Sequence, residues 1–119
     1  MERNKLLGAG GEALAKKYLL ANDYKLITAN YKISYPEIDL IARLKTEWVF
    51  IEVKTRLKTP DSLNENPLSK WQVKTLKRAI LDYAVKNRLN LEAVHLDLIV
   101  ILVDQTTKLA TLKHYRDVF

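Results

Sequence analysis

Two short apolar segments of the sequence carry charged residues where a protein core tolerates them least. The segment 37–41 reads Glu-Ile-Asp-Leu-Ile, and the segment 50–54 reads Phe-Ile-Glu-Val-Lys. A carboxylate or ammonium group inside such a segment is costly to bury unless it is paired or coordinated. Asp39, Glu52 and Lys54 are therefore the first candidates for chemistry.

The spacing of these charges predicts that they meet across a β-hairpin. With a turn at Lys45–Thr46, Asp39 lies opposite Glu52. The same register places Glu37 opposite Lys54, and alternation along each strand keeps the charged side chains on a common face. The register is open by a residue or two, because Lys-Thr is not a favoured tight-turn pair.

Two carboxylates in opposite positions repel each other, so a cation is expected between them. One interpretation is that Lys54 is that cation. The other is a Mg²⁺ ion held by Asp39 and Glu52, since hard divalent ions bind oxygen ligands and often use only one or two carboxylates. A lysine beside such an ion can orient or deprotonate a metal-bound water that attacks phosphorus.

A third carboxylate is available on the first helix. On a helical wheel Glu12 lies at the edge of the apolar face, together with Ala15 and Leu19. It could add an oxygen ligand to the pair of carboxylates. The alternative, favoured for Glu12 taken alone, is a surface pair with Lys16 one turn later.

The elements that position these residues follow from hydrophobic periodicity. A helix is followed by three strands, a second helix begun by a Ser69 cap, and two final strands, with a long polar loop over 56–68. This order, α-β-β-β-α-β-β, predicts an α/β fold with a central mixed β-sheet flanked by helices, in which 98–103 is a central strand buried on both faces. The helices are expected over 4–21 and 69–90, and the strands over 24–31, 37–44, 47–55, 94–103 and 108–114.

Composition limits the function classes. A chain of 119 residues with 48% hydrophobic residues is expected to form one domain, 1–119. It has no cysteine, which excludes a disulfide framework, a cysteine zinc site and a thiol nucleophile. We expect neither a membrane span nor a signal peptide, and a cytoplasmic location. The net charge of +6 favours an anionic partner such as nucleic acid.

Basic residues near the long loop are candidates for contacts with phosphate. Arg56 follows Lys54 directly, although an ion pair with Asp61 is the alternative. Trp71 could stack on a base, but covering the core is the favoured interpretation for it. Four further basic residues form one stripe on the second helix, which either tracks a phosphate backbone or is only a solvated face. These four are Lys70, Lys74, Lys77 and Arg78.

Four motifs together resemble the successive signatures of the YraN family of small bacterial proteins. The resemblance spans essentially the whole chain, and it implies a restriction-endonuclease-like fold, similar to that of Holliday-junction resolvases. The motifs are Gly8-x-Gly10-Gly11-Glu12-x-x-Ala15, Asn30-Tyr31, Glu37-Ile-Asp-Leu-Ile-Ala42 and Phe50-Ile-Glu-Val-Lys-Thr-Arg56. The last two also match the nuclease pattern PD-(D/E)xK.

The resemblance implies roles for particular residues. Asp39 and Glu52 would be metal ligands for Mg²⁺ or Mn²⁺, and Glu12 an additional ligand. Lys54 would position water or act as a general base, and the role of Glu37 stays open. The expected function is that of a Mg²⁺-dependent endonuclease that hydrolyses phosphodiester bonds.

The expected partner is nucleic acid, DNA rather than RNA, with a homodimer as a further option. The alternatives are a nucleic-acid-binding protein that keeps the nuclease fold without turnover, and a scaffold for a protein partner. Asp97 is expected to be structural, Gln72 has no settled role, and His95 and His114 lack ligand spacing. The glycine cluster is expected to serve close helix packing, because no strand precedes it and no Lys-Ser/Thr follows it as in a phosphate-binding loop.

Overall fold

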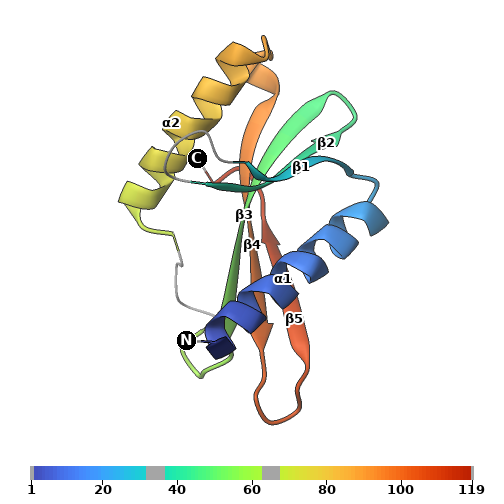
Figure 1. The fold of residues 1–119 in the computed structure, drawn as a ribbon, viewed down its shortest axis with the longest axis vertical. Helices are drawn as coiled ribbons and strands as arrows, with labels where there is room; N and C mark the ends of the chain where they lie inside the picture. The colour runs from blue at the N-terminus through green and yellow to red at the C-terminus, as the bar shows by residue number, and fades with distance from the viewer. Residues whose placement is uncertain (1, 32–36, 63–67, 119) are drawn as a thin grey trace.

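The computed structural model describes residues 2–31, 37–62 and 68–118 of the protein. A long helix is followed by three strands, a second helix and two strands, in the predicted order (Figure 1). Part of the predicted long loop, 63–67, lies outside the described residues. The elements are α1 (Glu2–Ala21), β1 (Lys25–Tyr31), β2 (Ile38–Leu44), β3 (Glu47–Leu57), α2 (Lys70–Lys86), a 3₁₀ turn η1 (Leu91–Ala93), β4 (Val94–Val103) and β5 (Ala110–Tyr115).

The strands form one mixed sheet in the order β1-β2-β3-β4-β5. Neighbouring strands are antiparallel except for β3 and β4, which are parallel and are joined by the crossover through α2. A parallel pair needs a connection of this kind, because a short turn can only reverse the chain. The predicted α/β fold of the restriction-endonuclease-like type is confirmed.

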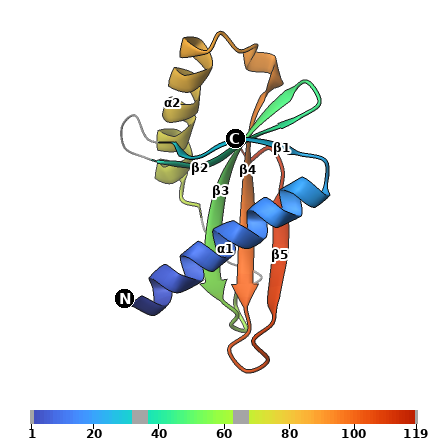
Figure 2. The ribbon, with the colours of Figure 1, turned by 45° about the vertical axis from the view of Figure 1, so that its right-hand side comes forward.

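Each face of the sheet carries its own hydrophobic cluster. Ala15 and Leu19 of α1 pack on one face with Ile51 of β3, and Figure 2 shows α1 crossing in front of β3 and β4. Ile80 of α2 packs on the other face with Phe50 of β3. Alternate residues of β3 therefore serve opposite clusters, which fixes the face on which each of its charged residues lies.

The strand β4 contributes to both clusters, as predicted for 98–103. Leu98, Val100 and Leu102 belong to the α2 side, whereas Ile99 and Ile101 belong to the α1 side. All five side chains are buried. The middle strand of the sheet is β3 rather than β4, because β4 has only β5 beyond it.

Most element ends differ from the sequence prediction by no more than two residues, and the end of α2 differs by four. The strand β3 continues to Leu57, because it stays paired in parallel register as far as Leu57–Val103. The helix α2 ends at Lys86 instead of Asn90, since Arg88 adopts a left-handed conformation with φ of 54°. Such a residue terminates a helix, and it is usually a glycine or asparagine. An arginine in this position gives no signal in the sequence.

Candidate functional site

The β2–β3 hairpin has the predicted register. Its turn is at Lys45–Thr46, with Lys45 in a left-handed conformation at φ of 57°. The ladder of pairs runs from Leu44–Glu47 to Leu40–Ile51. Beyond Leu40–Ile51, the described part of the two strands forms no further pair.

Asp39 lies where the two strands separate. Its Oδ2 accepts a hydrogen bond of 2.9 Å from the backbone N–H of Val53. This side-chain bond satisfies a β3 backbone donor beyond the last backbone pair of the two strands. Its carboxyl group also shares a hydrogen bond with that of Glu52. The predicted meeting of Asp39 and Glu52 is therefore observed, whereas the described part of the ladder does not extend to Glu37 and Lys54.

The contact between Asp39 and Glu52 changes the protonation of the pair. Burial raises the pKa of Asp39 from its ordinary value of 3.8 to about 8, and the hydrogen bond with Glu52 and the charge of Glu52 act in the same direction. The Val53 N–H and Lys54 lower this pKa, but by less. At neutral pH the protonated form of Asp39 is therefore favoured much more than in an exposed aspartate.

Lys54 lies beside the pair without neutralising it. Its Nζ is 3.7 Å from Oε2 of Glu52, and the two side chains are 19% and 13% exposed. The pKa of Asp39 is raised to about 8 with this ammonium group in place. The sequence allows either Lys54 or a Mg²⁺ ion as the cation that compensates the charges of Asp39 and Glu52. Lys54 alone is thus the weaker of these two interpretations.

Glu12 reaches the same region from α1 and is held there by an asparagine. With the Asn30 amide oriented by its partners, Nδ2 donates to Oε1 of Glu12 at 3.1 Å and to Oε1 of Glu37 at 2.8 Å. Burial raises the pKa of Glu12, and the charge of Asp39 raises it further, whereas Lys16 lowers it. Glu12 therefore lies toward Asp39, and no ion pair joins it to Lys16 among the described residues.

Asn30 is a site residue to which the sequence analysis assigned no role. It has φ of 54°, a left-handed conformation that asparagine adopts more readily than most residues. This conformation occurs at the end of β1, one residue before Tyr31. The only signal in the sequence was its place in the Asn30-Tyr31 motif, because the contact with Glu12 joins residues far apart in the chain.

The donor set fits a hard divalent cation. Asp39 and Glu52 supply carboxylate oxygens at one point, and a cation placed there would oppose the burial and the Glu52 charge that raise the pKa of Asp39. Two carboxylates suffice for Mg²⁺, which keeps several waters. Among the residues that the structure describes, no group of three or more Asp, Glu or His side chains is placed to hold a metal ion.

A comparison of the sequence with protein families gives one match. The profile of Uncharacterised protein family UPF0102 matches residues 11–101. The chain belongs to the UPF0102 family. This confirms the resemblance to YraN, because the YraN proteins are the UPF0102 family. The matched range includes every residue of the carboxylate site, from Glu12 to Lys54.

Several curated UPF0102 proteins are similar to this chain over most of its length. The UPF0102 protein of Shewanella sediminis is 39% identical over 87 residues, which is 73% of each chain. That of Alkaliphilus oremlandii is 33% identical over 116 residues, 98% of this chain and 99% of the relative. That of Christiangramia forsetii is 33% identical over 121 residues, 100% of this chain and 98% of the relative.

The predicted basic residues of this UPF0102 protein all lie on its surface. Arg56 is exposed and donates to the backbone carbonyl of Thr55, and no ion pair joins it to Asp61 in the described part of the chain. Gln72 has a structural role, since it forms a capping box with Ser69 at the start of α2. The exposed basic residues of α2 are Lys70, Lys74, Lys77 and Arg78.

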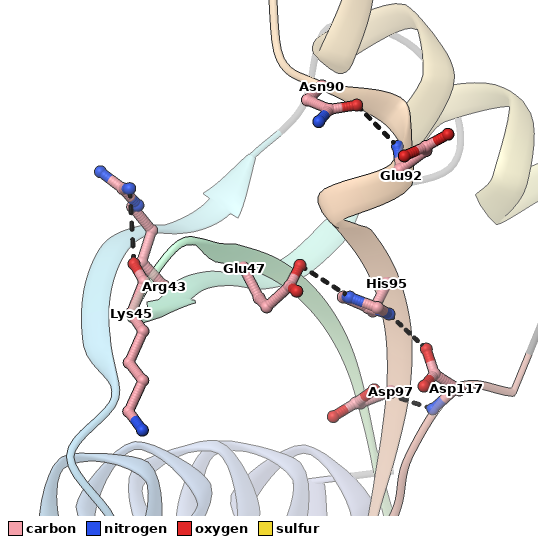
Figure 3. A network of polar contacts seen from close by, with 8 residues as sticks. All are labelled: Arg43, Lys45, Glu47, Asn90, Glu92, His95, Asp97 and Asp117. Carbon is pink, nitrogen blue, oxygen red and sulfur yellow. Dashed lines mark hydrogen bonds and ion pairs between the residues drawn. The ribbon is translucent and has the colours of Figure 1, made fainter.

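Two histidines that were assigned no role join a polar network on the α1 side of the sheet. His95 is hydrogen-bonded by Nε2 to Glu47 at 3.0 Å and by Nδ1 to Asp117 (Figure 3). Burial lowers the pKa of His95, but these two hydrogen bonds and both carboxylate charges outweigh it and raise the pKa overall. The network ties the segment after β5 to β3 and β4.

The second histidine, His114, contacts Asp97, for which the sequence predicts a structural role. Asp97 is 3% exposed, and its Oδ2 is 2.7 Å from Nε2 of His114. Nδ1 of His114 is 2.9 Å from the hydroxyl of Tyr18, which brings in α1. The backbone N–H of Asp117 donates to Oδ1 of Asp97 at 3.0 Å. Sequence spacing could not reveal this set, because its members come from α1, β4, β5 and the C-terminal segment.

Gly11 lets α1 approach β3 closely, as predicted for the glycine cluster. A Cβ atom at this position would collide with the side chain of Thr55, whereas a Cβ at Gly10 would meet nothing within 4 Å. We expect Gly11→Ala to destabilise the protein by about 1–3 kcal/mol in urea unfolding, through overpacking. Because α1 must shift, the substitution also moves Glu12.

The same helix supplies the control for this prediction. Gly10→Ala should stabilise the protein by up to about 1 kcal/mol, since alanine favours a helix and the space is open. In a Thr55→Ala background, Gly11→Ala should lower the free energy of unfolding by much less than it does in the wild-type protein. An equal cost in both backgrounds would show that contact with Thr55 is not its cause.

Proposed function

We propose that this UPF0102 protein is a metal-dependent nuclease that hydrolyses phosphodiester bonds in nucleic acid. The observation that carries the proposal is the contact between the partly buried Asp39 and Glu52, where the pKa of Asp39 is raised, with the ammonium group of Lys54 3.7 Å from Glu52. A protein that only needs a stable fold gains nothing from two carboxylates in contact, since apolar residues would serve better. Perturbed carboxyl groups of this kind are typical of functional sites.

Each residue of the site has a part in the proposed reaction. Asp39 and Glu52 would hold Mg²⁺ or Mn²⁺, and Glu12, which completes no group of three ligands among the described residues, would join them as an additional ligand only when the ion binds. When bound, such an ion lowers the pKa of water and stabilises the charge that develops on the phosphate. The ammonium group of Lys54 would orient the attacking water, or Lys54 in its neutral amine form would accept the proton of that water. Asn30 holds Glu12 in place through its amide.

The charge of the surface supports a polyanionic substrate. The net charge is +6 although several acidic residues are drawn into the site, and the exposed face of α2 presents a stripe of basic side chains. Contacts of this kind with phosphate supply most of the affinity of nucleic-acid-binding proteins at low salt. We propose DNA rather than RNA as the substrate, and a cytoplasmic location. No helix in the described ranges is long and apolar enough to cross a membrane.

A second candidate is a nucleic-acid-binding protein without turnover. What favours it is the raised pKa of Asp39, because a carboxyl group that gives up its proton less readily binds a metal ion less tightly. In this case the basic surface would bind DNA, and the carboxylates would be occupied by a proton rather than a metal.

The two candidates are separated by a cleavage assay on a panel of DNA and RNA structures with Mg²⁺ and with Mn²⁺. The panel holds single strands, duplexes, flaps and four-way junctions. We expect the wild-type protein and the control variant Asp23→Asn to cleave alike. Asp23 is exposed, and its left-handed conformation, with φ of 69°, is one that asparagine also adopts. Asp39→Asn should not cleave. If the folded wild-type protein binds nucleic acid without cleaving it, the second candidate function is favoured. If it neither binds nor cleaves nucleic acid, both candidate functions are wrong.

A further inference from the structure

Asn30 lies directly opposite Asp39 in the sheet. Two pairs of the β1–β2 ladder flank this position, and they are Ala29–Leu40 and Tyr31–Ile38. Residues opposite each other on antiparallel strands have Cα atoms about 5 Å apart. The residue whose amide reaches Glu12 is therefore also a close neighbour of Asp39.

The two strands change face at this position. The pair that includes Ala29 packs in the cluster on the α1 side of the sheet, whereas the pair that includes Tyr31 packs in the cluster on the α2 side. In a regular strand, residues two apart share a face. The switch coincides with the left-handed conformation of Asn30, with φ of 54°. Asp39, at the switch, is thus directed between the two faces, toward the backbone N–H of Val53.

The side chain of Asn30 holds two further carboxylates. Its Nδ2 donates to Oε1 of Glu12 at 3.1 Å and to Oε1 of Glu37 at 2.8 Å. An amide nitrogen carries two hydrogens, so one serves each carboxylate. Asn30 is exposed and could bond to water instead, so burial does not require these bonds. The bond to Glu12 occupies Oε1 and leaves Oε2 for an ion.

The contact with Asn30 gives Glu37 a place in the site. The sequence placed Glu37 opposite Lys54, but no ion pair joins these two side chains in the ranges that the structure describes. Its bond to Nδ2 is the shorter of the two, and it fixes the direction of the other N–H toward Glu12. Carboxylate ligands are commonly oriented by partners of this kind, which do not themselves touch the ion.

We propose that Asn30 is the positioning residue of the carboxylate site, and that Glu37 orients its amide. The left-handed backbone of Asn30 directs Asp39 toward β3. The amide of Asn30 keeps Glu12 beside Asp39, ready to join an ion. This assignment rests on the proposed function, because it concerns the divalent ion that this function requires.

Calorimetric titration with Mg²⁺ at pH 9 tests the amide. Asn30→Gly removes the amide but keeps the backbone, since glycine adopts the left-handed conformation without strain. We expect its dissociation constant for Mg²⁺ to rise about 10–100-fold. The control is Asn22→Gly, which removes another exposed amide, one that donates to the backbone carbonyl of Tyr18 at 2.8 Å. It should bind Mg²⁺ as the wild-type protein does.

A double-mutant cycle shows whether Asn30 acts through Glu12. Glu12→Gln should weaken Mg²⁺ binding by itself, and Asn30→Gly should then add little, because no carboxylate is left for the amide to hold. Glu37→Gln should weaken binding less than Asn30→Gly does, since the amide remains. In the Asn30→Gly variant, Glu37→Gln should lose most of its effect.

Hydrogen exchange in the metal-free protein tests the backbone. Asn30→Ala and Asn30→Gly both lack the amide, but only alanine is strained in the left-handed conformation. If this conformation directs Asp39, the N–H of Val53 should exchange about tenfold faster in Asn30→Ala than in Asn30→Gly. Exchange at Ile101 of β4 serves as the reference and should be similar in the two variants.

The failure of this assignment differs from the failure of the proposed function. If the wild-type protein binds Mg²⁺ and both Asn30→Gly and Glu37→Gln bind it equally well, the positioning role of the amide is wrong and the nuclease proposal stands. An equal cost of Asn30→Gly with and without Glu12→Gln shows an effect on the fold alone, which also overturns the assignment. Equal exchange at Val53 in the two Asn30 variants overturns the backbone role. If the wild-type protein binds no divalent ion, both proposals are wrong.

Discussion

Asp39→Asn is expected to raise the melting temperature of the metal-free protein at alkaline pH and, at the same time, to abolish its response to Mg²⁺. The pKa of Asp39 is raised to about 8 by burial and by Glu52. Above this pH the folded protein must hold two charged carboxylates in contact. An asparagine avoids that repulsion, keeps an oxygen that accepts the Val53 N–H, and offers Glu52 an amide donor that is present at every pH.

The direction of the pH dependence follows from linkage. In the folded protein the pKa of Asp39 is about 8, well above its ordinary value of 3.8, so the folded state binds the proton more tightly than the unfolded state does. The stability that this proton contributes is complete below about pH 4 and is lost as the pH rises through about 8. The advantage of Asp39→Asn should therefore be small at pH 5 and greatest at pH 9.

Thermal unfolding at these two pH values, with and without Mg²⁺, measures both effects. We expect Asp39→Asn to melt at least about 4 °C above wild type at pH 9 without metal, which corresponds to about 1 kcal/mol. Mg²⁺ should stabilise wild type more at pH 9 than at pH 5, because binding must displace the proton. A lower melting temperature of Asp39→Asn at pH 9, or an undiminished Mg²⁺ response, would contradict the electrostatic account of the site.

The hairpin could be predicted from the sequence because its determinants are local. Apolar alternation fixes which residues share a face, and a turn at Lys45–Thr46 then fixes the register that brings Asp39 to Glu52. The helix start at Ser69 was equally local, since its capping box spans three residues. Patterns of this length are visible in one sequence without any knowledge of the tertiary structure.

The parts that escaped prediction depend on contacts between distant segments. The Asn30 amide reaches Glu12 and Glu37 only because β1 and α1 meet at the separating strands. His95 gains its partners from the hairpin and from the C-terminal segment. The sequence favours a place over the core for Trp71, but the phase of α2 points this residue outward, and it is exposed. The place of Trp71 follows from the helical phase alone, whereas the partners of Asn30 and His95 depend on the tertiary structure.

Lys54→Met is expected to slow cleavage by about 10²–10⁴-fold while nucleic-acid binding persists. Methionine keeps the unbranched shape but removes the charge and the only donor that Lys54 offers to Glu52 and to water. The carboxylates that would hold the metal are untouched, so the stabilisation by Mg²⁺ should survive at high pH. Single-turnover cleavage, binding of an uncleavable oligonucleotide and thermal unfolding separate these three properties.

The charge of Lys54 has a second consequence, which separates its two possible roles. Since Lys54 lowers the pKa of Asp39, its removal should raise that pKa above about 8 and move the onset of the Mg²⁺ response to higher pH. Lys58→Met, at an exposed position beyond β3, should leave both the rate and the onset unchanged. If Lys54→Met shifts only the pH dependence and cleaves at the wild-type rate at pH 9, Lys54 tunes the carboxylate pair and takes no direct part in the reaction. A lower rate that persists at pH 9 assigns it to the attacking water.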